Sequence, residues 1–117
     1  MRTTSVARTT TESIPRDAAS LGPAVHPGEI LLEEFLKPLA ISQNRLGREL
    51  GVPPRRINEI VLGKRGISPD TAVRLALYFG TTERFWLGLQ TDYELEEVKR
   101  SAGDRIRRQV RPGRFAA

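Results

Sequence analysis

Two short helical segments joined by a restrained turn limit most strongly what this chain can fold into. The stretch "SQNRLGRELGVPPRRINEIVLG" has two leucines four residues apart, then a glycine and two prolines, then two isoleucines three residues apart. Gly51 suits the left-handed backbone that ends a helix, and Pro54 suits a first helical position, where a missing N–H is harmless. We therefore expect helices over about residues 43–50 and 54–62, joined by a tight turn.

Three further helices are expected around this pair. The first covers about residues 28–37, with apolar residues at helical spacing, and it meets Pro38 near its end. The fourth is capped by Ser68 and closed by Gly80, and the fifth is capped by Thr82 and lies within residues 81–101. Their apolar faces comprise Leu32, Phe35, Leu36 and Leu39, then Ala72, Leu75, Ala76 and Phe79, then Phe85, Trp86, Leu89 and Tyr93.

The fold class expected is all-α, a five-helix domain with a disordered arm before it and a short basic extension after it. Residues 1–24 are rich in Thr, Ser, Ala, Arg and Pro and have no apolar period, which predicts a disordered arm. We place the domain at residues 25–95 and the extension, a candidate dimerisation element, at residues 96–117. Within the extension, residues 104–111 fit a helix or a short strand.

Charge is distributed unevenly along the chain, whose formal net charge is +5. Residues 42–66 carry a net charge of +4, residues 81–98 a net charge of −4, and residues 99–117 a net charge of +6. The basic middle coincides with the two joined helices. This overlap favours a polyanionic partner at that place.

The helix that starts at Pro54 has the position of the recognition helix in a helix-turn-helix motif. Its first turn displays Arg55 and Arg56, and guanine O6 and N7 are the natural bidentate target of an arginine. Gln43, at the start of the preceding helix, is placed to meet a DNA phosphate. The candidate DNA-binding residues are Ser42, Gln43, Pro54, Arg55, Arg56, Asn58, Glu59, Lys64 and Arg65.

Other classes of site find little support in the composition. The chain has no cysteine and one histidine, so we expect no catalytic residue, no metal site and no cofactor. Glu33 and Glu34 are adjacent and point apart on a helix, which disfavours a paired-carboxylate site. No apolar run reaches the length of a membrane span, so we expect a cytoplasmic protein without membrane contact.

Three linked motifs resemble the HigA family of antitoxins, helix-turn-helix proteins of the phage-repressor-like XRE class. They are His-Pro-Gly-Glu from His26, the segment Leu62 to Gly66, and Phe85-Trp86-Leu87, and the resemblance covers about residues 25–111. It implies a homodimer that binds its own operator DNA and neutralises a HigB-type toxin, a ribosome-dependent mRNA endoribonuclease. Leu62 stands where such families usually carry Asn, and Gly47 where Ala is commoner.

Alternatives to this interpretation concern the partner. A stand-alone helix-turn-helix repressor without a toxin fits the same residues, whereas an RNA-binding adaptor is disfavoured because the arginine-rich tail has one aromatic residue for base stacking. For the toxin surface we favour an acidic segment over residues 1–24, which carry few apolar anchors. The acidic segment consists of Asp92, Glu94, Glu96 and Glu97.

Overall fold

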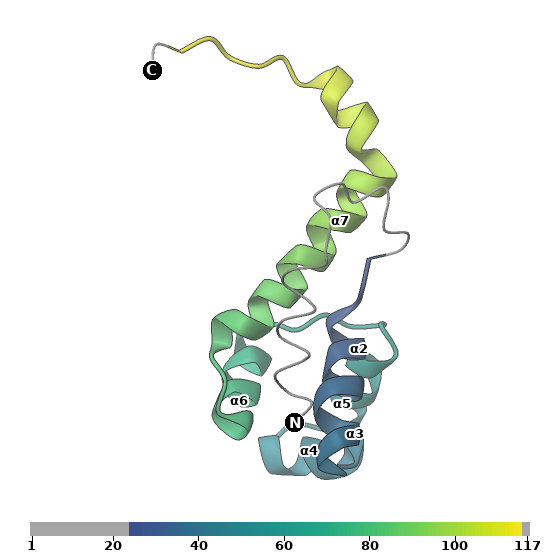
Figure 1. Cartoon of the computed structure of the whole chain (residues 1–117), viewed down its shortest axis with the longest axis vertical. Helices are drawn as coiled ribbons and strands as arrows, with labels where there is room; N and C mark the ends of the chain where they lie inside the picture. Colours follow the sequence, from purple (N-terminus) through teal and green to yellow (C-terminus); the bar gives the residue numbers. More distant parts are fainter. Residues whose placement is uncertain (1–23, 116–117) are drawn as a thin grey trace.

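The computed structural model describes residues 24–115, and apart from Ala24 the predicted disordered arm lies outside this range. The described residues form five helices and no strands, as expected (Figure 1). The first helix is built from three consecutive segments with different hydrogen-bond spacing. The elements are α2 (Pro27–Ile30), η2 (Leu31–Leu36), α3 (Lys37–Leu39), α4 (Gln43–Leu50), α5 (Pro54–Val61), α6 (Pro69–Phe79) and α7 (Glu83–Gln109).

The first helix widens in its middle into the π-helical turn η2. The backbone N–H of Lys37 donates to the carbonyl of Leu32, five residues earlier. Pro38 follows directly, and in a regular α-helix its ring would clash with the carbonyl four residues before it. The wider turn lets the helix continue through Pro38 to Leu39, where Ala40 ends it in a left-handed conformation with φ of 57°.

Helices α4 and α6 begin at serine caps and end at glycines, where the sequence predicts. Ser42 Oγ accepts the backbone N–H of Arg45 at 3.0 Å and caps α4, and Ser68 Oγ accepts the backbone N–H of Thr71 and caps α6. Gly51 and Gly80 follow these two helices, both with φ of 77°, a conformation that costs glycine little. The bounds of α4 and α6 are therefore specified by their own sequence.

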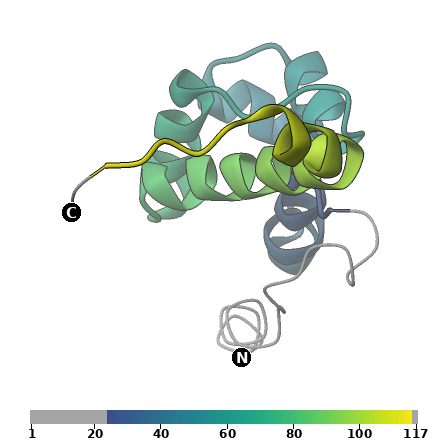
Figure 2. The same ribbon diagram turned by 90° about the horizontal axis from the view of Figure 1, so that it is seen from above.

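Helix α7 is longer than the fifth helix expected from the sequence. It runs for 27 residues and passes the predicted domain boundary at residues 95 and 96 without a break. The open choice for residues 104–111 is decided in favour of helix as far as Gln109. The first half of α7 packs on α6, and its second half projects from the domain (Figure 1). Figure 2, from above, shows α7 running across the domain.

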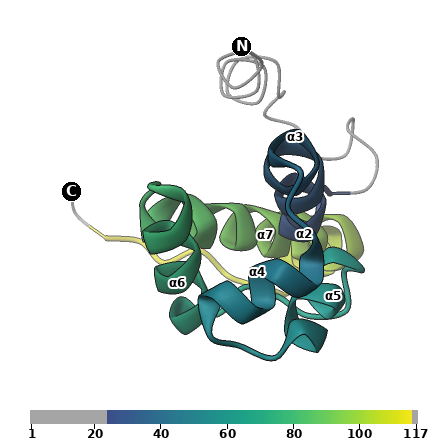
Figure 3. The same cartoon turned by 90° about the horizontal axis from the view of Figure 1, so that it is seen from below.

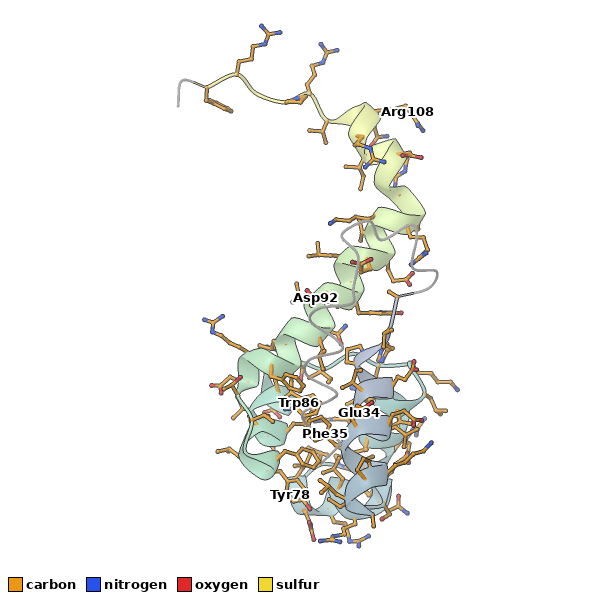
Figure 4. The ribbon with its side chains drawn as sticks, viewed as in Figure 1. Glu34, Phe35, Tyr78, Trp86, Asp92 and Arg108 are labelled. Atoms are coloured by element: carbon orange, nitrogen blue, oxygen red, sulfur yellow. The ribbon has the colours of Figure 1, made fainter. Side chains whose placement is uncertain are left out.

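The hydrophobic core lies between the first helix, α4, α5, α6 and the start of α7. Trp86 is fully buried, its ring lies 4.9 Å from that of Phe35, and its indole N–H donates to Thr81 Oγ1 at 2.7 Å (Figure 4). This confirms Trp86 as a core residue. Leu39 was expected on the apolar face but is 55% exposed, because it occupies the last turn of its helix.

Candidate nucleic-acid interface

Helices α4 and α5 form a helix-turn-helix unit with a very close backbone contact. A Cβ atom built on Gly47 would lie 2.7 Å from the Cα atom of Pro54. Only glycine avoids this overlap. The presence of Gly47, where alanine is commoner, therefore lets α4 and α5 approach each other more closely than alanine would allow. Figure 3 shows α4 and α5 side by side, with the first helix next to them.

A hydrogen bond joins the two helices of this unit at their predicted DNA-binding residues. The side-chain amide of Asn58 on α5 donates to Gln43 Oε1 on α4 at 2.7 Å, and both residues are partly buried. The bond uses the carbonyl oxygen of Gln43 and leaves its Nε2 group as a donor for a phosphate. Asn58 therefore positions Gln43, a role that sequence spacing alone did not indicate.

Glu59 organises the cations on the outer face of α5. Its two carboxylate oxygens accept from Arg55 Nε at 3.1 Å and from Arg65 Nε at 2.9 Å. The hydrogen bonds from Arg65 and Arg55 hold the pKa of Glu59 below its usual value, against a smaller opposing effect of burial. Because each arginine engages Glu59 through Nε, the terminal nitrogens of its guanidinium group can still form a bidentate contact.

The remaining predicted residues lie near the same edge but are held differently. Pro54 and Arg56 are partly buried at the start of α5, whereas the side chain of Arg55 is 86% exposed. Lys64 is exposed in the turn after α5, where its backbone N–H donates to the carbonyl of Glu59 at 2.9 Å. The structure thus gathers the nine predicted residues at the start of α4, along α5 and in the turn that follows it.

Arg74 is a supporting residue that sequence reasoning missed. Its Nη1 donates to the carbonyl of Leu50 at 2.8 Å, and its Nε donates to Asp70 Oδ1 at 2.7 Å. The spacing of Asp70 and Arg74 on one helix could have predicted their ion pair. The contact with Leu50 joins residues 24 apart in the chain, and no local sequence pattern predicts it.

A second missed group connects α4 to α6 through Glu49. Its carboxylate accepts from Arg45 Nε at 3.1 Å and from the hydroxyl of Tyr78. The hydrogen bond from Tyr78, followed by that from Arg45, holds the pKa of Glu49 below its usual value, and the same contact raises the pKa of Tyr78. This chain of contacts fixes the outer face of α4 against α6.

The His-Pro-Gly-Glu motif fixes the end of α5 opposite to its cationic start. His26 Nδ1 accepts the backbone N–H of Gly28 at 2.9 Å and so caps the start of the first helix, and its ring lies 4.8 Å from that of Tyr93. A Cβ atom on Gly28 would lie 1.8 Å from the carbonyl oxygen of Ile60. The motif therefore docks the first helix directly on the backbone of α5.

Other kinds of site are not assembled in the part of the chain that the structure describes. Residues 24–115 contain no group of three or more His, Asp or Glu side chains placed to hold a metal ion. In the same range, no helix combines the length and apolar character needed to cross a bilayer.

Comparison with known proteins finds chains of similar sequence and similar fold. The model of the Helix-turn-helix family matches residues 32–86. Virulence-associated protein I of Dichelobacter nodosus is 55% identical over 74 residues, which cover 63% of this chain and 68% of that protein. Pseudomonas aeruginosa antitoxin HigA, solved with the higBA promoter, is 43% identical with a TM-score of 0.74, covering 76% of this chain and 97% of that one. Antitoxin GraA in complex with its operator is 42% identical with a TM-score of 0.73, covering 81% and 93%.

Proposed function

The chain belongs to the HigA family of helix-turn-helix proteins, and we propose that it is a DNA-binding autorepressor that also serves as an antitoxin. In this role a homodimer binds the operator of its own gene and neutralises a HigB-type toxin, an mRNA endoribonuclease. The observation that carries the proposal is the rigid mounting of α5, whose first turn presents Arg55 from a backbone in close contact with α4.

The proposed DNA contacts divide into those that read bases and those that position the domain. The start of α5 enters the major groove, where the exposed guanidinium group of Arg55 meets guanine O6 and N7. Ser42 and Gln43, at the N-terminus of α4, contact a phosphate, as do Lys64 and Arg65 in the turn after α5. Positioning contacts of this second kind add affinity that falls as salt concentration rises.

Glu59 orders the arginine side chains of this surface before DNA binds. By holding Arg55 and Arg65 through their Nε atoms, the carboxylate limits the conformations of two long side chains that otherwise move freely. Less side-chain entropy is then lost on binding. A carboxylate near DNA repels phosphate, so we attribute its presence at this point to the positioning of the two arginines.

The proposal assigns no catalytic activity to the chain. It acts through binding alone, on DNA in one role and on a toxin in the other, in the cytoplasm where operator and toxin are present.

The DNA-binding part is tested by anisotropy titrations with duplexes from the region upstream of the gene. Arg55→Ala should weaken binding to the operator by about 1 to 3 kcal/mol and relax the preference at one base pair. Lys64→Ala should weaken binding to all sequences alike and reduce the salt dependence. Arg84→Ala, which removes an exposed arginine from α7, is the matched control and should change neither.

Equal losses on operator and random DNA for both variants would contradict the assignment of Arg55 as a base-reading residue.

The antitoxin part is tested by co-expressing the full chain with the product of the neighbouring gene and following growth and translation. Rescue from a translation block is expected. A neighbouring product that does not arrest growth would favour the stand-alone repressor.

A further inference from the structure

The turn that follows α5 is tied to α7 at its far end. The backbone N–H of Ile67, a buried residue, donates to Gln90 Oε1 on α7 at 2.8 Å. Figure 1 shows this turn running from the end of α5 past α7 to α6. At its near end, the backbone N–H of Lys64 donates to the carbonyl of Glu59 on α5 at 2.9 Å. Lys64 and Arg65 therefore lie between two fixed points, one on α5 and one on α7.

The side-chain amide of Gln90 has a donor end and an acceptor end, and its surroundings fix which end faces the turn. Glu94, one helical turn further along α7, accepts from Gln90 Nε2 at 2.9 Å. An ionised carboxylate only accepts hydrogen bonds, so it binds the NH2 end of the amide and leaves the carbonyl end for Ile67. With the amide reversed, its NH2 group would face the N–H of Ile67, and a buried donor would lose its acceptor.

Gly66 lets this amide lie directly against the turn. A Cβ atom built on Gly66 would lie 2.7 Å from Gln90 Nε2 and 2.9 Å from both Cδ and Oε1 of the same side chain. The whole amide group therefore occupies the space that a side chain at position 66 would need. A glycine at this position leaves room for the amide between its two hydrogen-bond partners.

We propose that Glu94 is a positioning residue for DNA binding, which acts through Gln90 on the turn that carries Lys64 and Arg65. This assignment rests on the proposed contacts of these two cations with DNA phosphates. Both side chains are exposed, and a turn that is fixed at both ends loses less conformational freedom when they bind. Glu94 thus supports binding through two hydrogen bonds, although its negative charge alone opposes the approach of DNA.

Reversing the charge at position 94 separates this role from simple electrostatics. Glu94→Lys replaces an acceptor by a group that only donates, which should reverse the amide of Gln90 and release the turn. In anisotropy titrations, operator and random duplexes should both bind about tenfold more weakly, and the slope of log Kobs against log salt should become shallower by about 1. Electrostatics alone predicts the opposite, tighter binding, because the chain becomes more basic.

Three further variants test the orientation of the amide. Glu94→Gln keeps a carbonyl that accepts from Gln90 and should bind within about twofold of the unmodified chain. Asp92→Lys makes the same change of charge at an exposed position on another side of α7 and should tighten binding slightly. Gln90→Glu combined with Glu94→Lys gives position 90 two acceptor oxygens, one for Ile67 and one for the new ammonium group, and should restore binding.

Amide hydrogen exchange, measured by NMR without DNA, reports on the turn itself. The N–H of Ile67 should exchange about tenfold faster in Glu94→Lys and in Gly66→Ala, whose new methyl group displaces the amide of Gln90. Urea unfolding followed by Trp86 fluorescence checks that each variant is folded, as expected for changes at the exposed positions 66 and 94.

Four results are decisive against one proposal or the other. Tighter DNA binding by Glu94→Lys would overturn the positioning role, because charge alone would then govern this surface, and so would an equal loss for Asp92→Lys, which lies on another side of the helix. Faster exchange of Ile67 with unchanged DNA binding would show that the hydrogen bonds serve the fold only. A double variant that binds no better than Glu94→Lys would refute the amide orientation as the cause. If the unmodified chain binds no operator, the DNA-binding proposal fails, and the exchange of Ile67 alone decides whether Glu94 orients Gln90.

Discussion

Replacing Gly47 by alanine should destabilise the protein, whereas the same replacement at Gly88 should stabilise it. Both glycines lie inside helices, where alanine is favoured by about 1 kcal/mol. At Gly88 no atom lies within 4 Å of the added Cβ, so this gain is kept. At Gly47 the Cβ would lie 2.7 Å from the Cα of Pro54, and relieving the overlap costs about 1 to 3 kcal/mol or more.

The two variants therefore isolate the steric cost, which is the difference between their unfolding free energies. Urea unfolding followed by Trp86 fluorescence measures both, because this residue is the only tryptophan and is fully buried. Each kcal/mol corresponds to a shift in Tm of about 4 to 8 °C for a domain of this size. Gly47→Ala should also weaken operator binding, because α5 must shift to make room. Equal stabilisation by both substitutions would refute the close contact between α4 and α5.

Two further predictions concern the stability of the folded domain. Burial lowers the pKa of His26 below its ordinary 6.5, so the folded chain binds fewer protons than the unfolded chain just below that pH. The unfolding free energy should fall as pH drops below about 6.5, and His26→Asn, which keeps an acceptor for Gly28, should flatten this dependence. Gln90→Leu removes the acceptor of the buried Ile67 N–H and should cost about 1 to 3 kcal/mol in urea unfolding, whereas Gln109→Leu at an exposed site should cost less than about 0.5.

Local signals in the sequence predicted most of the helical framework. Helix α4 has the predicted bounds, because Ser42 and Gly51 act within one turn of its ends. Helix α5 ends one residue before the predicted Leu62, and α6 begins and ends at its predicted signals. Such caps depend on neighbouring backbone groups only, so the linear sequence contains the needed information.

Elements that depend on distant residues were predicted poorly or not at all. The full length of α7 was missed, because residues 104–111 fitted a helix or a strand equally well, whereas the helix continues to Gln109. The hydrogen bond between Gln43 and Asn58 joins residues 15 apart, and its partners became evident only when α4 and α5 were placed together. The nine candidate DNA-binding residues were found from motif position, and their roles in contacting DNA stay predictions.

Close backbone approaches at both ends of α5 explain how this helix can read DNA with little ordering cost. Gly47 lets α4 contact the backbone of α5 at Pro54, the start of α5. Gly28 lets the first helix contact the carbonyl of Ile60, near the end of α5. Neither approach tolerates a Cβ atom, so α5 cannot slide or tilt without breaking a contact. Only its outward side chains remain adjustable, and Glu59 restrains two of these. Changes at Arg55 can therefore alter operator preference while the mounting of the helix, and with it the fold, stays the same.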